Sequence, residues 1–280
     1  MREIISWKTE GPFSLDHLMQ VVERLRDPDS GCPWDIQQSF KSIVASTLEE
    51  CYELIDAIQK EDFSHVEEEL GDVLFQVVFY AQMGSEKSYF DLASVIDGLV
   101  KKLIRRHPHV FGSSEENLNC DPKRDNKQMS VSDVKNTWEK IKAQERTERD
   151  HRSALADVPL TLPSLSRAQK IQKRASQVGF DWKDHDGPLD KIEEELLELR
   201  DSLSEGDRDQ IKSELGDLLF SCVNLSRHLN LDAEESLRCA TEKFENRFVT
   251  MENEVVRSGR LFKDLSMADC DALWKKAKNS

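Results

Sequence analysis

Several patterns that would assign this chain to a common class are missing from its sequence. None of the six cysteines forms a C-x-x-C pair, which argues against a zinc ribbon or a disulfide framework and favours reduced thiols. No apolar run reaches the ~18 residues that a membrane-spanning helix needs, and the first residues lack the apolar core of a signal peptide. We therefore expect a cytoplasmic protein without membrane contact.

Positive charge is also scarce. The chain has 39 Lys and Arg residues against 54 Asp and Glu residues, so its formal net charge is −15. Direct nucleic-acid binding is not expected, because contact with a phosphate backbone needs a basic surface. A polyanionic substrate is compatible with this charge only if a metal cation mediates its binding.

The sequence lacks a Gly-rich phosphate loop, a nucleophile elbow and zinc-type His/Cys spacing. Its acid-rich segments contain no Glu-x-x-His pair of the kind found in di-iron bundles, which argues against redox iron. Neither half shows a convincing run of alternating apolar and polar residues, so strands are not expected. The predicted fold class is all-α.

Apolar residues recur at helical spacing along most of the chain. Leu70, Leu74 and Val77, with their neighbours Val73 and Val78, predict one buried helix stripe. Polar loops are expected at 27–35 and 179–188, and a mobile polar insertion at 112–132. The predicted helices cover 15–26, about 48–58, 66–83, 90–106, 134–149, 165–178, the two acidic stretches within 191–217, and 234–256. A tail with Trp274 follows at 268–278.

One acidic stretch occurs twice. Residues 48–72 and 191–217 carry acids at matching places with a constant offset of 145 residues, and the apolar run LGDVLFQVV matches LGDLLFSCV. A repeat of this length indicates duplication of one helical unit. The predicted organisation is an N-terminal domain at 1–150, a linker at 151–163 and a C-terminal domain at 164–280.

The repeated acids have a spacing that favours metal binding. Acids three residues apart lie on one helix face, and an antiparallel helix pair centred on Gly206 or on Glu61 would bring two such pairs together. Carboxylates this close repel one another unless a proton or a cation intervenes, and an all-oxygen ligand set favours Mg2+ or Mn2+. Any one of these acids alone would fit a solvated helix face equally well. The predicted metal ligands are Glu50, Glu53, Glu69 and Asp72 in the first copy, and Glu195, Glu198, Glu214 and Asp217 in the second.

These motifs resemble a known family. The pattern EE-x-x-E, followed sixteen residues later by ELGD and an apolar run, is present twice and is similar to that of the tandem MazG nucleoside triphosphate pyrophosphohydrolases. Further matches are CPWD at 32–35, RRHPHVF at 105–111, WEKIKAQE at 138–145 and VGFDW at 178–182. The resemblance implies an all-α fold with a four-helix core. It also implies a homodimer whose neighbouring helices complete the pocket, and Mg2+-dependent hydrolysis of (d)NTPs to the monophosphate and pyrophosphate.

The resemblance also implies residue roles. The second-copy acids would act in catalysis through the metal, with the general base unassigned, and the second half would be the main catalyst. Trp274 would lie beside the nucleotide. The alternative interpretation of Trp274 is that its ring packs the C-terminal tail down. The matching basic pair of the first half is Lys102 and Arg106. The implied substrate contacts are Lys191, Glu194, Lys243, Arg247 and Trp274.

Other interpretations of the function stay open at this stage. The N-terminal half could be a non-catalytic module for dimerisation or partner binding. The protein could instead be specific for one nucleotide, such as dUTP or an oxidised dNTP. Its cellular role could be house-cleaning of the nucleotide pool or a part in the stringent response.

Overall fold

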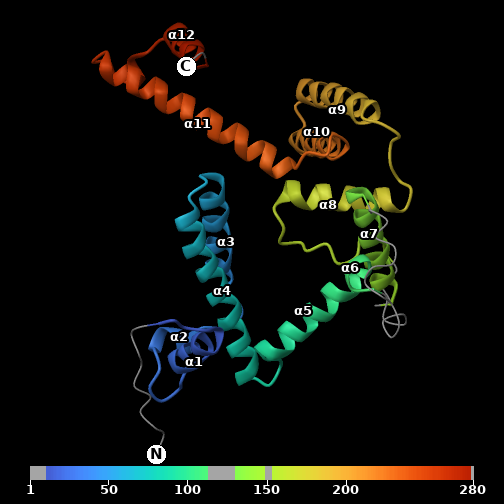
Figure 1. Ribbon diagram of the computed structural model, residues 1–280. Helices are drawn as coiled ribbons and strands as arrows, with labels where there is room; N and C mark the ends of the chain where they lie inside the picture. Colours follow the sequence, from blue (N-terminus) through green and yellow to red (C-terminus); the bar gives the residue numbers. More distant parts are fainter. Residues whose placement is uncertain (1–10, 113–129, 149–152, 279–280) are drawn as a thin grey trace, which may run out of the picture. The chain divides into compact units, whose positions relative to one another are not determined.

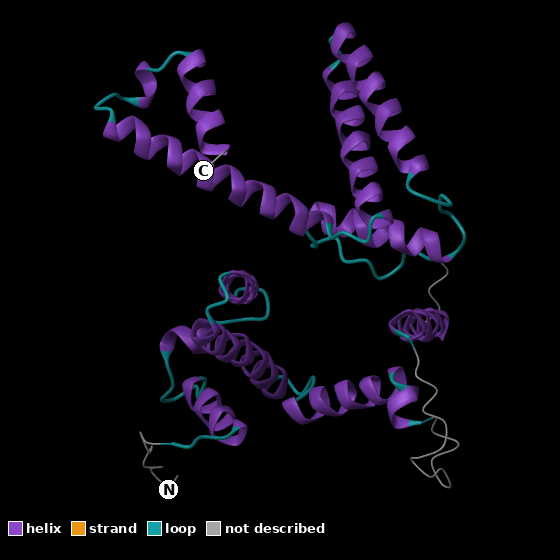
Figure 2. Ribbon diagram, turned by 45° about the horizontal axis from the view of Figure 1, so that its top comes forward, coloured by secondary structure: helices purple, strands orange, loops and turns teal. Residues whose placement is uncertain are grey.

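The computed structural model describes residues 11–112, 130–148 and 153–278. This part of the chain contains twelve α-helices and one 3-10 helix, and no strand (Figure 2). The all-α prediction is therefore confirmed. Most of the predicted polar insertion, at 113–129, lies outside the described residues.

The chain divides into two compact units, Met1–Lys142 and Ala143–Ser280, with the division inside α7 (Val131–Glu148). The predicted domain limits 1–150 and 164–280, with their linker, stay a prediction. The helices of the first unit are α1 (Leu15–Leu25), α2 (Pro33–Gln37), α3 (Val44–Gln59), α4 (Phe63–Glu86), α5 (Leu92–Arg106) and α6 (Pro108–Phe111). The helical segments of the second unit are α8 (Ser164–Gln177), α9 (Asp186–Glu205), α10 (Arg208–His228), α11 (Ala233–Arg257), η1 (Phe262–Asp264) and α12 (Met267–Lys278).

The core of the first unit lies around the C-terminal half of α4. Val78, Phe79 and Met83 of this helix are almost fully buried against Val22 of α1 and Ile43, which directly precedes α3. Burying side chains of this size contributes roughly 1.5–3 kcal/mol each. The opposite half of α4, which carries the acids, pairs with α3 and extends beyond this core.

The predicted buried stripe on α4 is wrong for three of its members. Leu70, Leu74 and Val77 are 53%, 44% and 42% exposed, whereas Val78 is buried. The reason is geometric: α3 covers one side of α4, and α1 contacts only part of the rest. Periodicity identified an apolar face correctly, but it could not tell which apolar residues find a partner within the chain.

The second unit is built on the α9–α10 pair. Helix α8 packs against α10 and α11, and α12 folds back along α11 (Figure 1). The amide Nε2 of Gln172 on α8 donates to the carbonyl oxygen of Phe220 on α10 at 2.8 Å, which ties α8 to the middle of the pair. None of the described helices is long and apolar enough to cross a membrane.

Two stretches predicted as loops contain helical turns. α2 begins at Pro33 inside the predicted loop 27–35, and α9 begins at Asp186 inside the predicted loop 179–188. Proline fits the first turn of a helix because its missing N–H has no partner there. Pro33 and Pro188 therefore mark helix starts, where the composition had suggested irregular chain.

Candidate functional site

The first acid cluster lies on the α3–α4 hairpin. Helix α3 ends at Gln59, and Glu61 turns the chain with a left-handed φ of 54°. Asp62 then caps α4, because its Oδ1 accepts the backbone N–H of His65 at 3.2 Å. The turn is therefore centred on Glu61, as the mirrored spacing of the acids predicts.

The second acid cluster lies on the α9–α10 hairpin, and its turn is built in the same place of the repeat. Gly206 ends α9 with φ 80°. The Oδ1 atom of Asp207 accepts the backbone N–H groups of Asp209 and Gln210 at 2.9 and 3.3 Å. Glycine adopts this left-handed conformation without steric cost, so the second turn is the less strained of the two.

In each copy, three of the four predicted acids converge. One carboxylate oxygen from each member lies within 4.8 Å of those of the other two. The N-terminal triad is Glu50, Glu69 and Asp72, and the C-terminal triad is Glu195, Glu214 and Asp217. The fourth predicted ligand of each copy, Glu53 or Glu198, is not a member. The ligand assignment of all eight acids stays a prediction.

The fourth acids, Glu53 and Glu198, nevertheless lie close enough to the triads for their charges to interact. The pKa of Glu50 is raised, first by loss of solvent contact and then by the charges of Asp72 and Glu53. The pKa of Glu198 is raised by the same two causes, with Glu195 and Glu214 as the repelling neighbours. A cation held between the oxygens would relieve this repulsion.

Each triad has one buried carboxylate, and the two occupy different helices. Glu69 on α4 is 6% exposed and Glu195 on α9 is 4% exposed. Each pairs with a basic side chain four residues earlier on its own helix. His65 Nε2 lies 2.7 Å from Glu69 Oε1, and Lys191 Nζ lies 2.7 Å from Glu195 Oε1.

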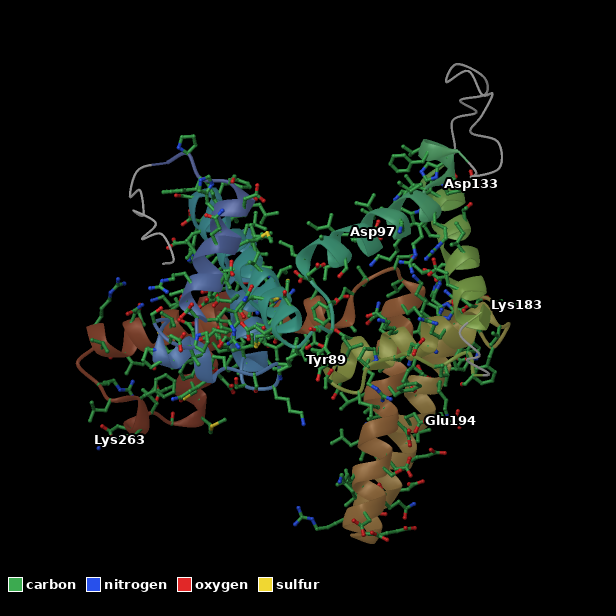
Figure 3. All side chains as sticks on the ribbon, turned by 90° about the horizontal axis from the view of Figure 1, so that it is seen from below. Tyr89, Asp97, Asp133, Lys183, Glu194 and Lys263 are labelled. Carbon is green, nitrogen blue, oxygen red and sulfur yellow. The ribbon has the colours of Figure 1, made fainter. Side chains whose placement is uncertain are left out.

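Lys191 also contacts the predicted substrate residue Glu194, at 2.9 Å between Nζ and Oε1. Figure 3 labels Glu194 on α9. The hydrogen bonds that Lys191 makes to Glu195 and Glu194 raise the pKa of Lys191, so this lysine keeps its positive charge beside the triad. The matching position in the first copy is Ser46, which cannot supply such a charge.

The triads fit a hard divalent cation. Their donors are carboxylate oxygens alone, which Mg2+ prefers to softer ligands. In the N-terminal triad the buried Oε2 of Glu69 has no hydrogen-bond partner among the described residues. Leaving a buried acceptor unpaired costs about 1–3 kcal/mol, and more when it is charged. A cation shared with Glu50 and Asp72 would remove this cost.

The remaining predicted substrate contacts form a second group on α11 and α12. The guanidinium carbon of Arg247 lies 5.9 Å from the ring centroid of Trp274, and the rings of Phe244 and Trp274 are 5.3 Å apart. Lys243 is exposed one turn before Arg247. Trp274 thus contacts α11 with Arg247 beside it, and its predicted place next to a nucleotide stays a prediction.

The structure does not bring this second group to the C-terminal triad. Within the described part of the chain, no hydrogen bond, ion pair or ring contact links Lys243, Arg247 or Trp274 to Lys191, Glu194 or Glu195. In two views α12 lies apart from the α9–α10 pair (Figures 1 and 2). A pocket that used both groups would need a further helix to complete it.

Sequence reasoning missed two features near the clusters. One is His65, whose signal was available: it stands four residues before Glu69, where the second copy has Gln210. The other is the anchor of the loop before α9. Arg227 Nη1 donates to Asp181 Oδ2 at 2.9 Å, and His228 Nε2 lies 3.0 Å from Asp181 Oδ1. These partners, Arg227 first, lower the pKa of Asp181.

Comparison with known proteins gives a consistent result. The model of the MazG nucleotide pyrophosphohydrolase domain matches residues 38–111 and 184–250, so it covers both hairpins. The nucleoside triphosphate pyrophosphohydrolase of Escherichia coli is 45% identical over 267 residues, which cover 94% of this chain and 97% of that protein. The MazG nucleoside triphosphate pyrophosphohydrolase/pyrophosphatase of Thermotoga maritima is 45% identical over 269 residues, 96% of this chain and 97% of that protein.

A longer protein is similar to this chain over about half of its own length. The uncharacterized protein YabN of Bacillus subtilis is 41% identical over 261 residues, which cover 93% of this chain but 50% of that protein. The family match falls in two segments, as duplication predicts. These matches confirm the resemblance and the expected enzyme class, and the chain belongs to the MazG nucleotide pyrophosphohydrolase family.

Proposed function

We propose that this chain hydrolyses ribo- and deoxynucleoside triphosphates to the monophosphate and pyrophosphate, with Mg2+ held by the acid triads. The observation that carries the proposal is the convergence of three carboxylates within 4.8 Å, twice, in a chain of this family. A cluster of negative charge cannot hold a triphosphate by itself. It can do so through a cation that both bind.

The residues of the C-terminal cluster divide the work. Glu195, Glu214 and Asp217 would hold the metal, with Glu198 beside them. When bound, Mg2+ would supply charge neutralisation on the triphosphate and acidify an attacking water. A carboxylate of the cluster would accept the proton of that water. Hydrolysis then depends on positioning and charge, as in phosphoryl transfer generally.

The basic residues would bind the phosphates. Lys191 lies at the triad and stays charged, so it would contact the phosphate nearest the metal. Lys243 and Arg247 are four residues apart on α11 and therefore share a face. They would bind the outer phosphates, with Glu194 and Trp274 bordering the nucleotide.

We place the main activity in the second half. Its triad has Lys191 beside the buried carboxylate, whereas the first half has Ser46 at that position and lacks this phosphate-binding charge. The first half keeps a complete triad, so we expect it to bind metal. Its contribution to turnover should be the smaller one.

A homodimer would complete the pocket. Leu196 and Leu203 share one face of α9, Leu215 and Leu219 share one face of α10, and all four are 40–58% exposed. A second copy that covers these apolar residues could also bring the Arg247–Trp274 group to a triad. Light scattering on the full chain should give twice the mass of one chain, and a monomer would contradict this part of the proposal.

We assign the protein to the cytoplasm and to house-cleaning of the nucleotide pool. The described cysteines, which are Cys32, Cys51, Cys222, Cys239 and Cys270, are all free thiols. Free thiols suit a reducing compartment, and nucleoside triphosphates are made and used there.

The test is direct. Purified full-length protein is incubated with Mg2+ and a panel of canonical, uracil-containing and oxidised nucleotides in 18O-labelled water. Attack at the α-phosphorus releases pyrophosphate and puts the label into the monophosphate. Release of orthophosphate alone, or no turnover with any nucleotide, contradicts the proposal. Glu198→Ala and Glu53→Ala, made singly, divide the activity between the halves, and loss of turnover in Glu53→Ala alone would contradict our preference for the second.

A further inference from the structure

His65 places an imidazole nitrogen, a possible metal ligand, beside the N-terminal triad, whereas the C-terminal triad has the ammonium group of Lys191. Its Nε2 atom lies 2.7 Å from Oε1 of Glu69, and the side chains of the two residues are 43% and 7% exposed. Both stand on one face of α4, because residues four apart on a helix are neighbours. The ring nitrogens of His65 are not among the atoms of the triad that lie within 4.8 Å of one another, so the imidazole borders the triad through its contact with the buried member Glu69.

The buried carboxylate is only half satisfied. Oε1 of Glu69 faces His65, whereas Oε2 is buried and has no hydrogen-bond partner within the part of the chain that the structure describes. Glu69 also supplies an oxygen within 4.8 Å of those of Glu50 and Asp72. An unpaired, more than nine-tenths buried carboxylate oxygen at a cluster of acids is where a cation would be most stabilising.

The basic partners of the two triads differ in what they can do to a metal. A lysine ammonium has three donors and no lone pair, so Lys191 can only compete with a cation for Glu195. A neutral imidazole has a lone pair and is a common ligand of zinc, cobalt and other borderline ions. Two ligands on one helix face, four residues apart, are also the spacing that zinc sites use.

We propose that His65 joins Glu50, Glu69 and Asp72 to form a mixed nitrogen–oxygen site, which favours borderline transition ions such as Co2+ or Zn2+ relative to Mg2+ more strongly than the all-oxygen C-terminal triad does. The inference rests on the proposed function in one respect, that the triads bind metal. The two copies then differ in the ion that they select. The first then has the stronger preference for a transition ion, although it also binds Mg2+, and the second is the Mg2+ site of the hydrolysis.

A plain ion pair is the competing interpretation. A His–Glu pair four residues apart on a helix can stabilise that helix without any metal. In that case His65 would contribute nothing to metal affinity. The two interpretations therefore predict opposite results when His65 is replaced by the residue at the same register of the second copy, which is Gln210.

The experiment measures binding of Co2+ alone and of Mg2+ alone to the full chain by titration calorimetry, without nucleotide. His65→Gln should weaken Co2+ binding at one site about tenfold or more and leave Mg2+ binding within about twofold, since loss of one ligand interaction costs metal sites 10–100-fold. The reciprocal Gln210→His should raise Co2+ affinity at the second site. His109→Gln, which removes an exposed histidine of the first unit outside the triad, is the matched control and should change neither.

Spectroscopy supplies a readout that is independent of affinity. Electron spin-echo modulation of Mn2+-loaded protein should show imidazole nitrogen in the native chain and in His109→Gln, and none in His65→Gln. An unchanged Co2+ affinity in His65→Gln, or equal losses for Co2+ and Mg2+, would overturn the inference while hydrolysis by the second half stands. Failure of either ion to bind the native chain would overturn the proposed function as well.

Discussion

The two acid triads place their oxygens alike but bury them differently. In the first copy the buried member is Glu69 on the second helix of the hairpin, and in the second copy it is Glu195 on the first helix. The basic partner moves with the buried acid, as His65 in one case and Lys191 in the other. The two copies thus have acids at the same positions, whereas a different basic side chain compensates the buried carboxylate in each copy.

The difference bears on function because a buried carboxylate must be compensated. Lys191 does this permanently, since its hydrogen bonds to Glu195 and Glu194 raise its pKa. In the first triad no described residue donates to Glu69 Oε2, so a bound cation would stabilise this triad more. Under the proposed function, the second cluster would hold an anionic substrate next to its metal, and the first would mainly hold a metal.

The largest expected effect comes from neutralising the buried acid of each triad. Glu195→Gln should lower kcat at least about 100-fold, the usual cost of removing one preorganised charge contact in an active site. Glu69→Gln should lower it less than about fivefold, because the proposed function gives the first half the smaller share of turnover. Steady-state pyrophosphate release with Mg2+ and a preferred nucleotide measures both.

Two exposed acids on the same helices serve as matched controls. Glu193→Gln on α9 and Glu67→Gln on α4 remove the same charge away from the triads and should leave kcat within about twofold. Equal losses in Glu195→Gln and Glu69→Gln would mean that the halves share the chemistry. A larger loss in Glu69→Gln would reverse the assignment.

The next largest expected effect is on stability, and it should differ between the arginine anchors of the two units. In the first unit Arg26 binds Glu86 through two hydrogen bonds of 2.7 Å, and its side chain is 7% exposed. In the second unit Arg227 binds Asp181, and their side chains are 15% and 26% exposed. Arg26 is the more buried arginine and also donates to the backbone carbonyls of Asp35 and Gln38, so its removal leaves more acceptors unpaired. Arg26→Met should therefore lower the free energy of unfolding by about 3 kcal/mol and Arg227→Met by about 1–2 kcal/mol.

These anchors also predict how stability falls in acid. Arg26 lowers the pKa of Glu86 from its ordinary 4.5, and Arg227 lowers that of Asp181 from its ordinary 3.8. A carboxylate whose pKa is lower when folded stabilises the protein above its unfolded pKa and loses that contribution as the pH falls through the folded value. Glu86→Gln should flatten the loss beginning below about pH 4.5, and Asp181→Asn the loss beginning below about pH 3.8. Urea unfolding between pH 3 and 7 measures both slopes, and variants that keep the native slope would contradict the prediction.

Much of this arrangement could be predicted from residue order. The offset of 145 residues and the acids three apart indicate two helix pairs whose turns centre on Glu61 and Gly206, and both turns are found there. These features are local, since they depend on helix period and turn chemistry. The same local rules explain why the predicted limits of α4, α5, α7, α8 and α11 agree with the structure to within about three residues, whereas α9 begins earlier than predicted, at Asp186, and α10 continues past the predicted stretch to His228.

The features that sequence reasoning missed depend on packing between elements. Whether Glu69 or Glu50 is buried depends on what covers each helix, and the spacing of the acids is the same in either case. The exposed Leu70 and Leu74 show the same limit, because periodicity identifies an apolar face but not its partner. Trp274 could be assigned to the tail, yet its distance from the triad depends on where α12 folds back.

The smallest expected effect concerns the turns between the two acidic helices of each copy, where only the residue type differs at one backbone position. Glu61 and Gly206 occupy the same place in the repeat, and both have left-handed φ values, 54° and 80°. A side chain in this conformation costs roughly 1–2 kcal/mol, which the extra flexibility of glycine in the unfolded chain partly offsets. Glu61→Gly should therefore raise the free energy of unfolding by about 0.5–1 kcal/mol, and Gly206→Glu should lower it by a similar amount. A Cβ at Gly206 would meet no atom within 4 Å, so any loss there reports backbone strain alone. Calorimetric melting of both variants measures the shifts, and a destabilised Glu61→Gly would show that the Glu61 side chain contributes more than its backbone strain costs.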